Sequence, residues 1–131
     1  MSRLTFYFDR NIGRKLPEAL MHLQPPFDVC WHNKEGFAHN MPDDKWMEVV
    51  GPRGWIVFSQ DWKFHIRDVE LEAVKQHNIK CFYLPGSGAT KWATYCQLIR
   101  SHARLIEIAQ NEAPPFIYDV KRNGHLKRIV F

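Results

Sequence analysis

Short apolar runs alternate with amphipathic stretches along most of the chain. Four runs rich in β-branched and aromatic residues are typical of β-strands: RLTFYF (3–8), PPFDVCWH (25–32), WIVFS (55–59) and IKCFYL (79–84). The last two are continuously apolar, as are strands that a parallel sheet buries on both faces. The pattern therefore predicts four strands within the first 84 residues.

Apolar residues at helical spacing fill the segments between these runs. We expect a first helix that begins around residues 14–16, because Pro17 is tolerated only in a first turn. A second helix follows in DKWMEVVGPRG, capped by Asp43 or Asp44, and a third in DVELEAVKQHN. The longest pattern spans residues 89–113. Its apolar residues at the helical period are Trp92, Tyr95, Cys96, Ile99, Ala103, Ile106 and Ala109.

The chain ends on a pattern of two strands. PPFIYDV and HLKRIVF flank a KRNG turn, which predicts a C-terminal hairpin over residues 115–131. The strands and helices that alternate before it predict an α/β fold, with α/β/α layers and a mostly parallel central sheet. No linker divides the chain, so we expect a single domain over residues 1–131, with its core at about 3–112.

Acidic residues stand near the ends of two predicted strands. Asp9 directly follows the first strand, Asp61 comes two residues after the third, and Asp43 and Asp44 open the helix that leads into the third. Ligand sites in such sheets lie beyond the carboxyl ends of the strands, so we expect these side chains at one edge. Carboxylates gathered there repel one another unless positive charge lies between them. A hard divalent cation supplies that charge and takes oxygen ligands, as in sites that cleave phosphodiesters.

Each of these residues also has an ordinary structural explanation. Asp43 and Asp44 are suited to capping a helix, and an Asp after a strand commonly forms a turn. Asp61 can pair with Lys63 or Arg67 as a surface ion pair of little energetic value. The segment PGSGATKW resembles a phosphate-binding loop only in part, and we expect it to be a turn and a helix cap.

Composition is that of an ordinary globular chain. Of the 131 residues, 45% are hydrophobic and 24% are charged, and no apolar run approaches the roughly 20 residues of a membrane span. The first ten residues lack the apolar segment of a secretory signal, and the three cysteines form no CxxC pair. We therefore expect a cytoplasmic location. The net charge of +4 favours a polyanionic partner, while His32 and His39 are expected to be exposed polar residues, with RNA contact as the alternative.

Three segments resemble the PIN-like domains, and particularly the small prokaryotic branch that includes VapC-type toxins. They are FYFDRNIGRKLPEAL, PDDKWMEVVGPRGWIVFSQDWK and DVELEAVKQHNIKCFYL, and the resemblance covers roughly residues 4–110. It implies an α/β nuclease that cuts RNA with Mg²⁺ or Mn²⁺ held by acidic residues. The partners it implies are an RNA substrate, an antitoxin protein and a second copy of the chain in a homodimer.

The resemblance also implies roles for individual acids. By motif, Asp9, Asp43 and Asp61 are the catalytic and metal-binding residues. This chain has DDKW where the branch often has DEE, so Asp44 is the alternative to Asp43. The fourth acid is left between Glu70 and its neighbour Asp68.

Other polar residues are expected to surround these acids. Asn11 and Ser59 match the amide and hydroxyl that orient the carboxylates, with a helix cap and a backbone partner as the alternatives. Contacts to the RNA backbone are expected from Arg10, Arg14, Lys63 and Arg67. The second hypothesis is a non-catalytic PIN-like module that binds RNA or protein, in which the acids are caps and ion pairs.

Overall fold

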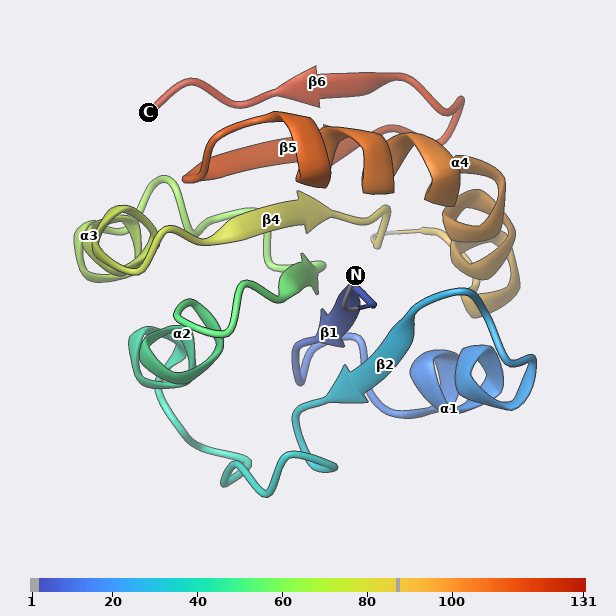
Figure 1. Cartoon of the computed structure of the whole chain (residues 1–131), viewed down its shortest axis with the longest axis horizontal. Coiled ribbons are helices and arrows are strands. Elements are labelled where there is room, and N and C mark those ends of the chain that lie inside the picture. Colours follow the sequence, from blue (N-terminus) through green and yellow to red (C-terminus); the bar gives the residue numbers. More distant parts are fainter. Residues whose placement is uncertain (1–2, 87) are drawn as a thin grey trace.

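A six-stranded sheet runs through the middle of the protein (Figure 1). The computed structural model describes residues 3–86 and 88–131. The strands are β1 (Thr5–Phe8), β2 (Asp28–Trp31), β3 (Ile56–Ser59), β4 (Lys80–Tyr83), β5 (Phe116–Val120) and β6 (Leu126–Arg128). They lie in the order β2-β1-β3-β4-β5-β6, and only the β5–β6 pair among them is antiparallel. The predicted α/β fold with a mostly parallel sheet is confirmed.

Two pairs of helices cover the two faces of this sheet. The helices are α1 (Lys15–His22), α2 (Asp43–Val50), α3 (Asp68–Gln76) and α4 (Lys91–Asn111). Alternate strand residues explain the layers, because Phe6 and Phe58 pack with leucines of α1 and α4, while Tyr7 and Val57 pack with α2 and α3. Figure 1 shows the two pairs on opposite sides of the strands. Among the described residues, no helix has the length and apolar character needed to cross a membrane.

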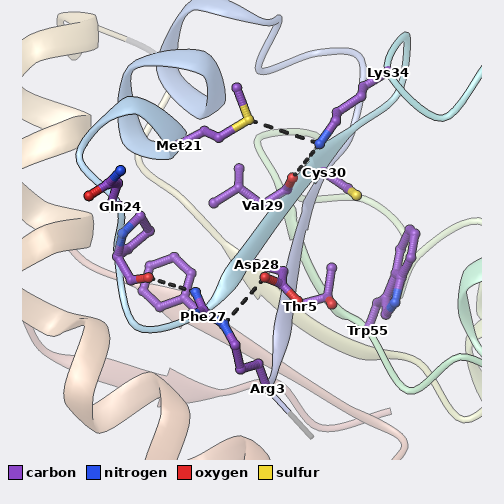
Figure 2. Close-up of a pocket in the computed structure, with 11 residues that line it drawn as sticks. Arg3, Thr5, Met21, Gln24, Phe27, Asp28, Val29, Cys30, Lys34 and Trp55 are labelled. Carbon is purple, nitrogen blue, oxygen red and sulfur yellow. Dashed lines mark hydrogen bonds and ion pairs between the residues drawn. The ribbon is translucent and has the colours of Figure 1, made fainter.

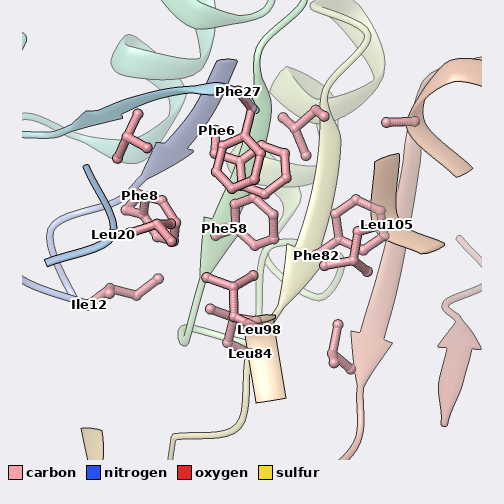
Figure 3. Packing of buried hydrophobic residues seen from close by; sticks show 14 of the residues in the cluster. Phe6, Phe8, Ile12, Leu20, Phe27, Phe58, Phe82, Leu84, Leu98 and Leu105 are labelled. Carbon is pink, nitrogen blue, oxygen red and sulfur yellow. The ribbon is translucent and has the colours of Figure 1, made fainter. Parts of the chain in front are cut away.

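Aromatic rings form the centre of the layer beneath α1 and α4 (Figure 3). Phe58 on β3 lies 4.7 Å from Phe6, 5.0 Å from Phe8 and 5.7 Å from Phe82, measured between ring centroids. Phe6 in turn stacks on Phe27 at 3.8 Å. Such contacts add to the free energy of burying the rings and hold three neighbouring strands in fixed register. The carboxyl ends of β1 and β3 are therefore rigidly placed beside each other.

Most element boundaries match the sequence expectations. Pro17 lies in the first turn of α1, and the expected hairpin is formed by β5 and β6. Because β5 also pairs in parallel with β4, the hairpin continues the central sheet. The expected cap of α2 is wrong: Pro42 is the N-cap residue, and Asp43, inside the helix, accepts a hydrogen bond at 2.9 Å from Nε1 of Trp46. Gly86 and Gly88 belong to the expected turn before α4, whose Ser87 lies outside the described residues.

The apolar stripe that periodicity identifies on α4 matches the buried face only in part, because Ala109 is buried whereas Trp92, Ile99 and Ala103 are exposed. The buried residues are Thr94, Gln97, Leu98, Ser101, Leu105 and Ala109. Three of them are polar, and their hydrogen bonds offset the cost of burial: Thr94 Oγ1 donates to Pro85 O at 3.1 Å, and Gln97 Nε2 donates to Ser101 Oγ at 2.8 Å. Trp92, by contrast, is 73% exposed. A pattern based on hydrophobicity alone misses a face that buries satisfied polar groups.

A matched pair of substitutions tests this orientation of α4. Leu98→Ala should lower the free energy of unfolding by about 2–5 kcal/mol, because it leaves a cavity in the core. Trp92→Ala should change it by no more than about 0.5 kcal/mol, because the ring lies on the surface. Urea unfolding followed by circular dichroism measures both. A larger loss for Trp92→Ala than for Leu98→Ala would contradict the arrangement.

Candidate functional site

Asp9 lies at the carboxyl end of β1 and is almost fully buried. Its backbone N–H donates to Phe58 O at 3.1 Å, so the residue stays beside β3 after β1 has ended. Its Oδ1 accepts from the backbone N–H of Asn11 at 2.8 Å, and its Oδ2 accepts from Oγ of Ser59 at 2.8 Å. Both carboxylate oxygens are therefore fixed by donors from two neighbouring strand ends.

Asn11 and Ser59 connect Asp9 to the segment that carries Asp61. Asn11 donates from Nδ2 to Ser59 Oγ at 3.3 Å and accepts at Oδ1 from the backbone N–H of Gln60 at 3.0 Å. The Ser59 hydroxyl oxygen also accepts from the backbone N–H of Asp61 at 3.0 Å. One hydroxyl thus contacts both acid-bearing segments, and the expected orienting residues lie between them.

Asp43 reaches this edge of the sheet from the start of α2. Arg10, which directly follows Asp9, donates from Nη1 to His39 O at 2.9 Å and to Met41 O, and its Nη2 lies 3.4 Å from Oδ1 of Asp43. The side chain of Arg10 therefore ties the loop before α2 to the end of β1. The sequence predicted Arg10 only as an RNA contact, and this tie was not foreseen.

Three carboxylates converge on the guanidinium of Arg67. Asp61 contacts it in a bidentate manner at 2.7 and 3.1 Å, and Glu70 contacts it at 3.0 Å. Asp43 lies 4.0 Å from the same group. The three acid side chains are 10–16% exposed, whereas that of Arg67 is 41% exposed. The guanidinium of Arg67 thus covers the three acids from the solvent side.

A backbone turn brings Arg67 back to Asp61. Trp62, between them in sequence, adopts a left-handed conformation with φ of 64°. That conformation costs a non-glycine residue about 1–2 kcal/mol, so it needs support from its surroundings. Nε1 of Trp62 provides such support by donating to Leu84 O at 2.8 Å. The indole anchors the turn to β4, and the Asp61–Arg67 pair closes it.

Burial and mutual repulsion shape the ionisation of the acids. Burial raises the pKa of Asp9 to about 7, hydrogen bonds from Asn11 and Ser59 oppose this, and the charges of Asp43 and Asp61 add to it. Burial also raises the pKa of Asp43, and the charges of Asp61 and Glu70 contribute, while Trp46 and Arg10 act in the opposite direction. The pKa of Arg67 is raised by its hydrogen bonds to Asp61 and Glu70. These acids therefore act electrostatically as one group, called here the acidic cluster (Asp9, Asp43, Asp61 and Glu70).

The alternative acids that the sequence left open lie in different places. Asp44 and Asp68 line a groove between α2 and α3, whereas Asp43 and Glu70 contact Arg67. The i, i+3 spacing of Arg67 and Glu70 at the start of α3 was the signal that could have selected Glu70.

The predicted RNA contacts are dispersed. Arg14 pairs with Glu18 on α1 at 3.6 Å, Lys63 is exposed, and Arg67 is held within the acidic cluster. The expectation of an exposed His32 is wrong: it is buried, and its ring contacts Tyr7 Oη at 3.1 Å and Ala38 O at 2.7 Å.

The chemistry of the acidic cluster suits a hard divalent cation, because all of its donors are carboxylate oxygens. As the side chains stand, no group of three His, Cys, Asp or Glu within residues 3–86 and 88–131 is arranged to hold a metal ion. Arg67 explains this, since its guanidinium lies where the carboxylates converge. The carboxylate oxygens of the acidic cluster are therefore of the kind that binds a divalent cation, and the guanidinium of Arg67 supplies positive charge at the same place.

A large hollow lies elsewhere. It measures about 740 Å³ and borders the start of β1 and the edge strand β2 (Figure 2). Its charged groups are paired: Arg3 lies 3.3 Å from Asp28, and Lys34 donates to Val29 O at 3.3 Å. The hollow is at the amino end of β1, opposite Asp9, so its size gives no reason to place the site there.

Comparison with known proteins adds one finding. A family model described as a PIN like domain matches residues 4–86. That span contains β1 to β4 and all four residues of the acidic cluster. Comparison with curated proteins gave no match, and neither did comparison with solved structures.

The buried carboxyl of Asp9 should make stability depend on pH. Its pKa is about 7 in the folded protein but about 4 in an unfolded chain, so deprotonation above about pH 4 favours unfolding. In chelator, its contribution is fully present below about pH 4 and is lost as the pH rises through about 7, a change of about 4 kcal/mol. Asp9→Asn should therefore raise the free energy of unfolding, relative to wild type, more at about pH 8 than at about pH 4. Urea unfolding across this range measures the difference, and identical pH profiles for the two proteins would contradict it.

Proposed function

Because the chain belongs to the family of PIN-like domains, we propose that it is a nuclease that hydrolyses RNA phosphodiester bonds with the help of a divalent cation. The observation that carries this proposal is the acidic cluster, in which carboxylates from β1, α2, α3 and the loop after β3 meet at the carboxyl edge of the sheet. Carboxylates this close together repel one another, and a divalent cation would offset that repulsion. The net charge of +4 supports a polyanionic substrate.

Asp9, Asp43, Asp61 and Glu70 would hold Mg²⁺ or Mn²⁺. When bound, such a cation would supply positive charge to the attacked phosphate and to the departing oxygen. Ser59 and Asn11 hold the Asp9 carboxylate in one orientation, and Ser59 also fixes the backbone of Asp61. Arg10 keeps Asp43 against the end of β1. These contacts set the donors in place before any ligand arrives, which limits the entropy lost on binding.

The finer proposal is that this nuclease is the toxin of a toxin–antitoxin pair in the cytoplasm. The resemblance to VapC-type toxins supports it. An antitoxin that blocked the acidic cluster with a basic side chain would use the same chemistry that Arg67 already provides. Expression of the chain with and without the product of the neighbouring gene tests this role, and growth arrest relieved by that product is the expected result.

A non-catalytic module that binds RNA or protein is the second candidate. The observation in its favour is the set of ion pairs around Arg67, which can neutralise the acids without any metal. Calorimetric titration separates the two candidates, because a nuclease of this type should bind Mn²⁺ saturably. If RNA binding persists in chelator and Mn²⁺ gives no heat of binding in calorimetry, the non-catalytic module is favoured.

Substitutions in the acidic cluster test the enzyme directly. Purified protein with Mn²⁺ should cut RNA, and Asp9→Ala or Asp61→Asn should lower the rate by about 100-fold or more, because each removes a carboxylate. Ser59→Ala should lower it by about 10- to 100-fold, since it only orients Asp9 and Asp61. Asp44→Asn is the matched control and should cut as fast as wild type, because Asp44 lines the groove between α2 and α3. Equal rates for all four variants and wild type would disprove the proposal.

Arg67 should oppose metal binding, because its guanidinium and the cation need the same carboxylates. Arg67→Gln should therefore tighten Mn²⁺ binding by roughly 5- to 100-fold in calorimetry, and the same variant should be less stable in chelator. Arg14→Gln is the control, since it removes the same charge from a residue paired only with Glu18 among the described residues. Weaker Mn²⁺ binding by Arg67→Gln would show instead that Arg67 supports the cation site.

A further inference from the structure

The face formed by α1 and α4 carries an exposed tryptophan between two hollows. Trp92, in the first turn of α4, lines both of them. One hollow, of about 340 Å³, lies between the helices and is largely apolar, with Leu16 and Leu23 of the α1 segment facing Tyr95. The other, of about 440 Å³, lies against the loop before α4 and contains Arg100 and Arg122. Trp92 thus lies between a largely apolar hollow and one that contains two arginines.

On this face the exposed ring of Trp92 stacks on the half-buried ring of Tyr95. Trp92 and Tyr95 lie 6.0 Å apart with only 15° between their planes. Nearby, Leu23 at the end of α1 is 65% exposed. An exposed apolar patch of this kind commonly marks a surface that another molecule covers. The ring of Trp92 is therefore free to contact a ligand from solvent, and Tyr95 supports it from the core side.

The charges around the stack restrict what that ligand is. Lys15 and Lys91 line the first hollow, and Arg100 and Arg122 line the second. No acidic residue is found among the described residues that line either hollow. Four cations around an aromatic stack complement a polyanion with flat rings, which is the chemistry of a single-stranded nucleic acid.

Hydrogen bonds connect this face to the acidic cluster. The carbonyl oxygen of Pro85 accepts from Nε2 of Gln60, the neighbour of Asp61, at 2.8 Å. The same oxygen accepts from Oγ1 of Thr94, in the first turns of α4, at 3.1 Å. Moreover, α1 and α4 both begin just beyond the carboxyl edge of the sheet, after β1 and β4. A single-stranded nucleic acid bound at the acidic cluster could therefore extend over the loop at Pro85 to Trp92.

We propose that Trp92 and Tyr95, together with Lys15, Lys91, Arg100 and Arg122, form a stacking platform for a single-stranded part of the RNA substrate. A base stacks on the exposed face of the Trp92 ring, and the four cations contact the phosphates on either side. This platform rests on the proposed function, because its occupant is the RNA that the acidic cluster would cut. It adds a binding subsite that lies on the opposite face of the sheet from α2 and α3. It predicts little preference among bases, since each base presents a π-face.

Binding without cleavage tests the platform separately from catalysis. The probe is a fluorescein-labelled single-stranded RNA of about 12 nucleotides, titrated with the full-length protein in chelator and followed by anisotropy. Trp92→Ala should weaken binding by about 5- to 100-fold, the range for loss of one stacked base, while Trp92→Phe should keep most of the affinity. Both variants alter an exposed side chain, and their thermal unfolding midpoints should match wild type.

A charge-matched pair of double variants tests the cations. Lys15→Glu with Lys91→Glu should weaken binding and reduce the slope of log affinity against log salt by about 1.4, because two phosphate contacts are lost. Lys45→Glu with Lys75→Glu makes the same change in net charge with exposed residues on α2 and α3, and it should have a clearly smaller effect.

The outcomes separate the platform from the proposed nuclease. Unchanged RNA binding by Trp92→Ala, or equal effects of the two double variants, would overturn the platform even where Mn²⁺-dependent cleavage is found. Weakened binding by Trp92→Ala would support the platform even where Asp9→Ala leaves cleavage unaltered and so disproves the nuclease. A Trp92→Ala variant that dissociates a dimer in sedimentation and binds RNA normally would identify the surface as an interface with a second copy, which also overturns the platform.

Discussion

Repulsion between carboxylates at the end of a parallel sheet is the constraint on which this site depends. Topology places the ends of β1 and β3 side by side, and the aromatic core beneath them prevents the strands from moving apart. The acids that follow these strands must therefore be protonated, hydrogen-bonded or neutralised. All three solutions occur: Asp9 has a raised pKa, Ser59 and Asn11 donate to it, and Arg67 neutralises Asp61 and Glu70. The negative charge that attracts the guanidinium of Arg67 would also attract a divalent cation.

Arg67 gives the acidic cluster two electrostatic states. With the guanidinium in place, its one positive charge partly neutralises Asp43, Asp61 and Glu70. If a divalent cation bound there, as proposed, the guanidinium would have to leave, and its exposed position would let it do so without unfolding α3. The free energy of metal binding in such a site is the gain from the cation minus the loss of the Arg67 ion pairs. The affinity would therefore be weaker than the number of carboxylates suggests.

The sequence was sufficient for the fold and for the placement of several acids of the candidate site, because both follow from local patterns and sheet topology. Apolar runs ending in Asp9 and near Asp61 identified the strands and the edge, and the parallel topology then brought the acids together. Arg67 was weighed only as an ion pair for Asp61 or an RNA contact. Its approach to Asp43 depends on the left-handed turn at Trp62, whereas its i, i+3 spacing with Glu70 was a local signal that was not used. The buried face of α4 was missed for a different reason. Gln97, Ser101 and Thr94 are polar, and only the structure shows that their hydrogen bonds are satisfied within the core.

The two outer strands of the sheet have consequences for self-association. β6 is three residues long and carries Lys127 and Arg128. β2 is four residues long, and the carbonyl oxygen of its Val29 accepts a hydrogen bond from Lys34. Short, charged or blocked edges discourage strands of another molecule from adding to a sheet. A second copy of the chain would therefore meet this one through its helices or loops, and a sheet continuous across two molecules is disfavoured from either side.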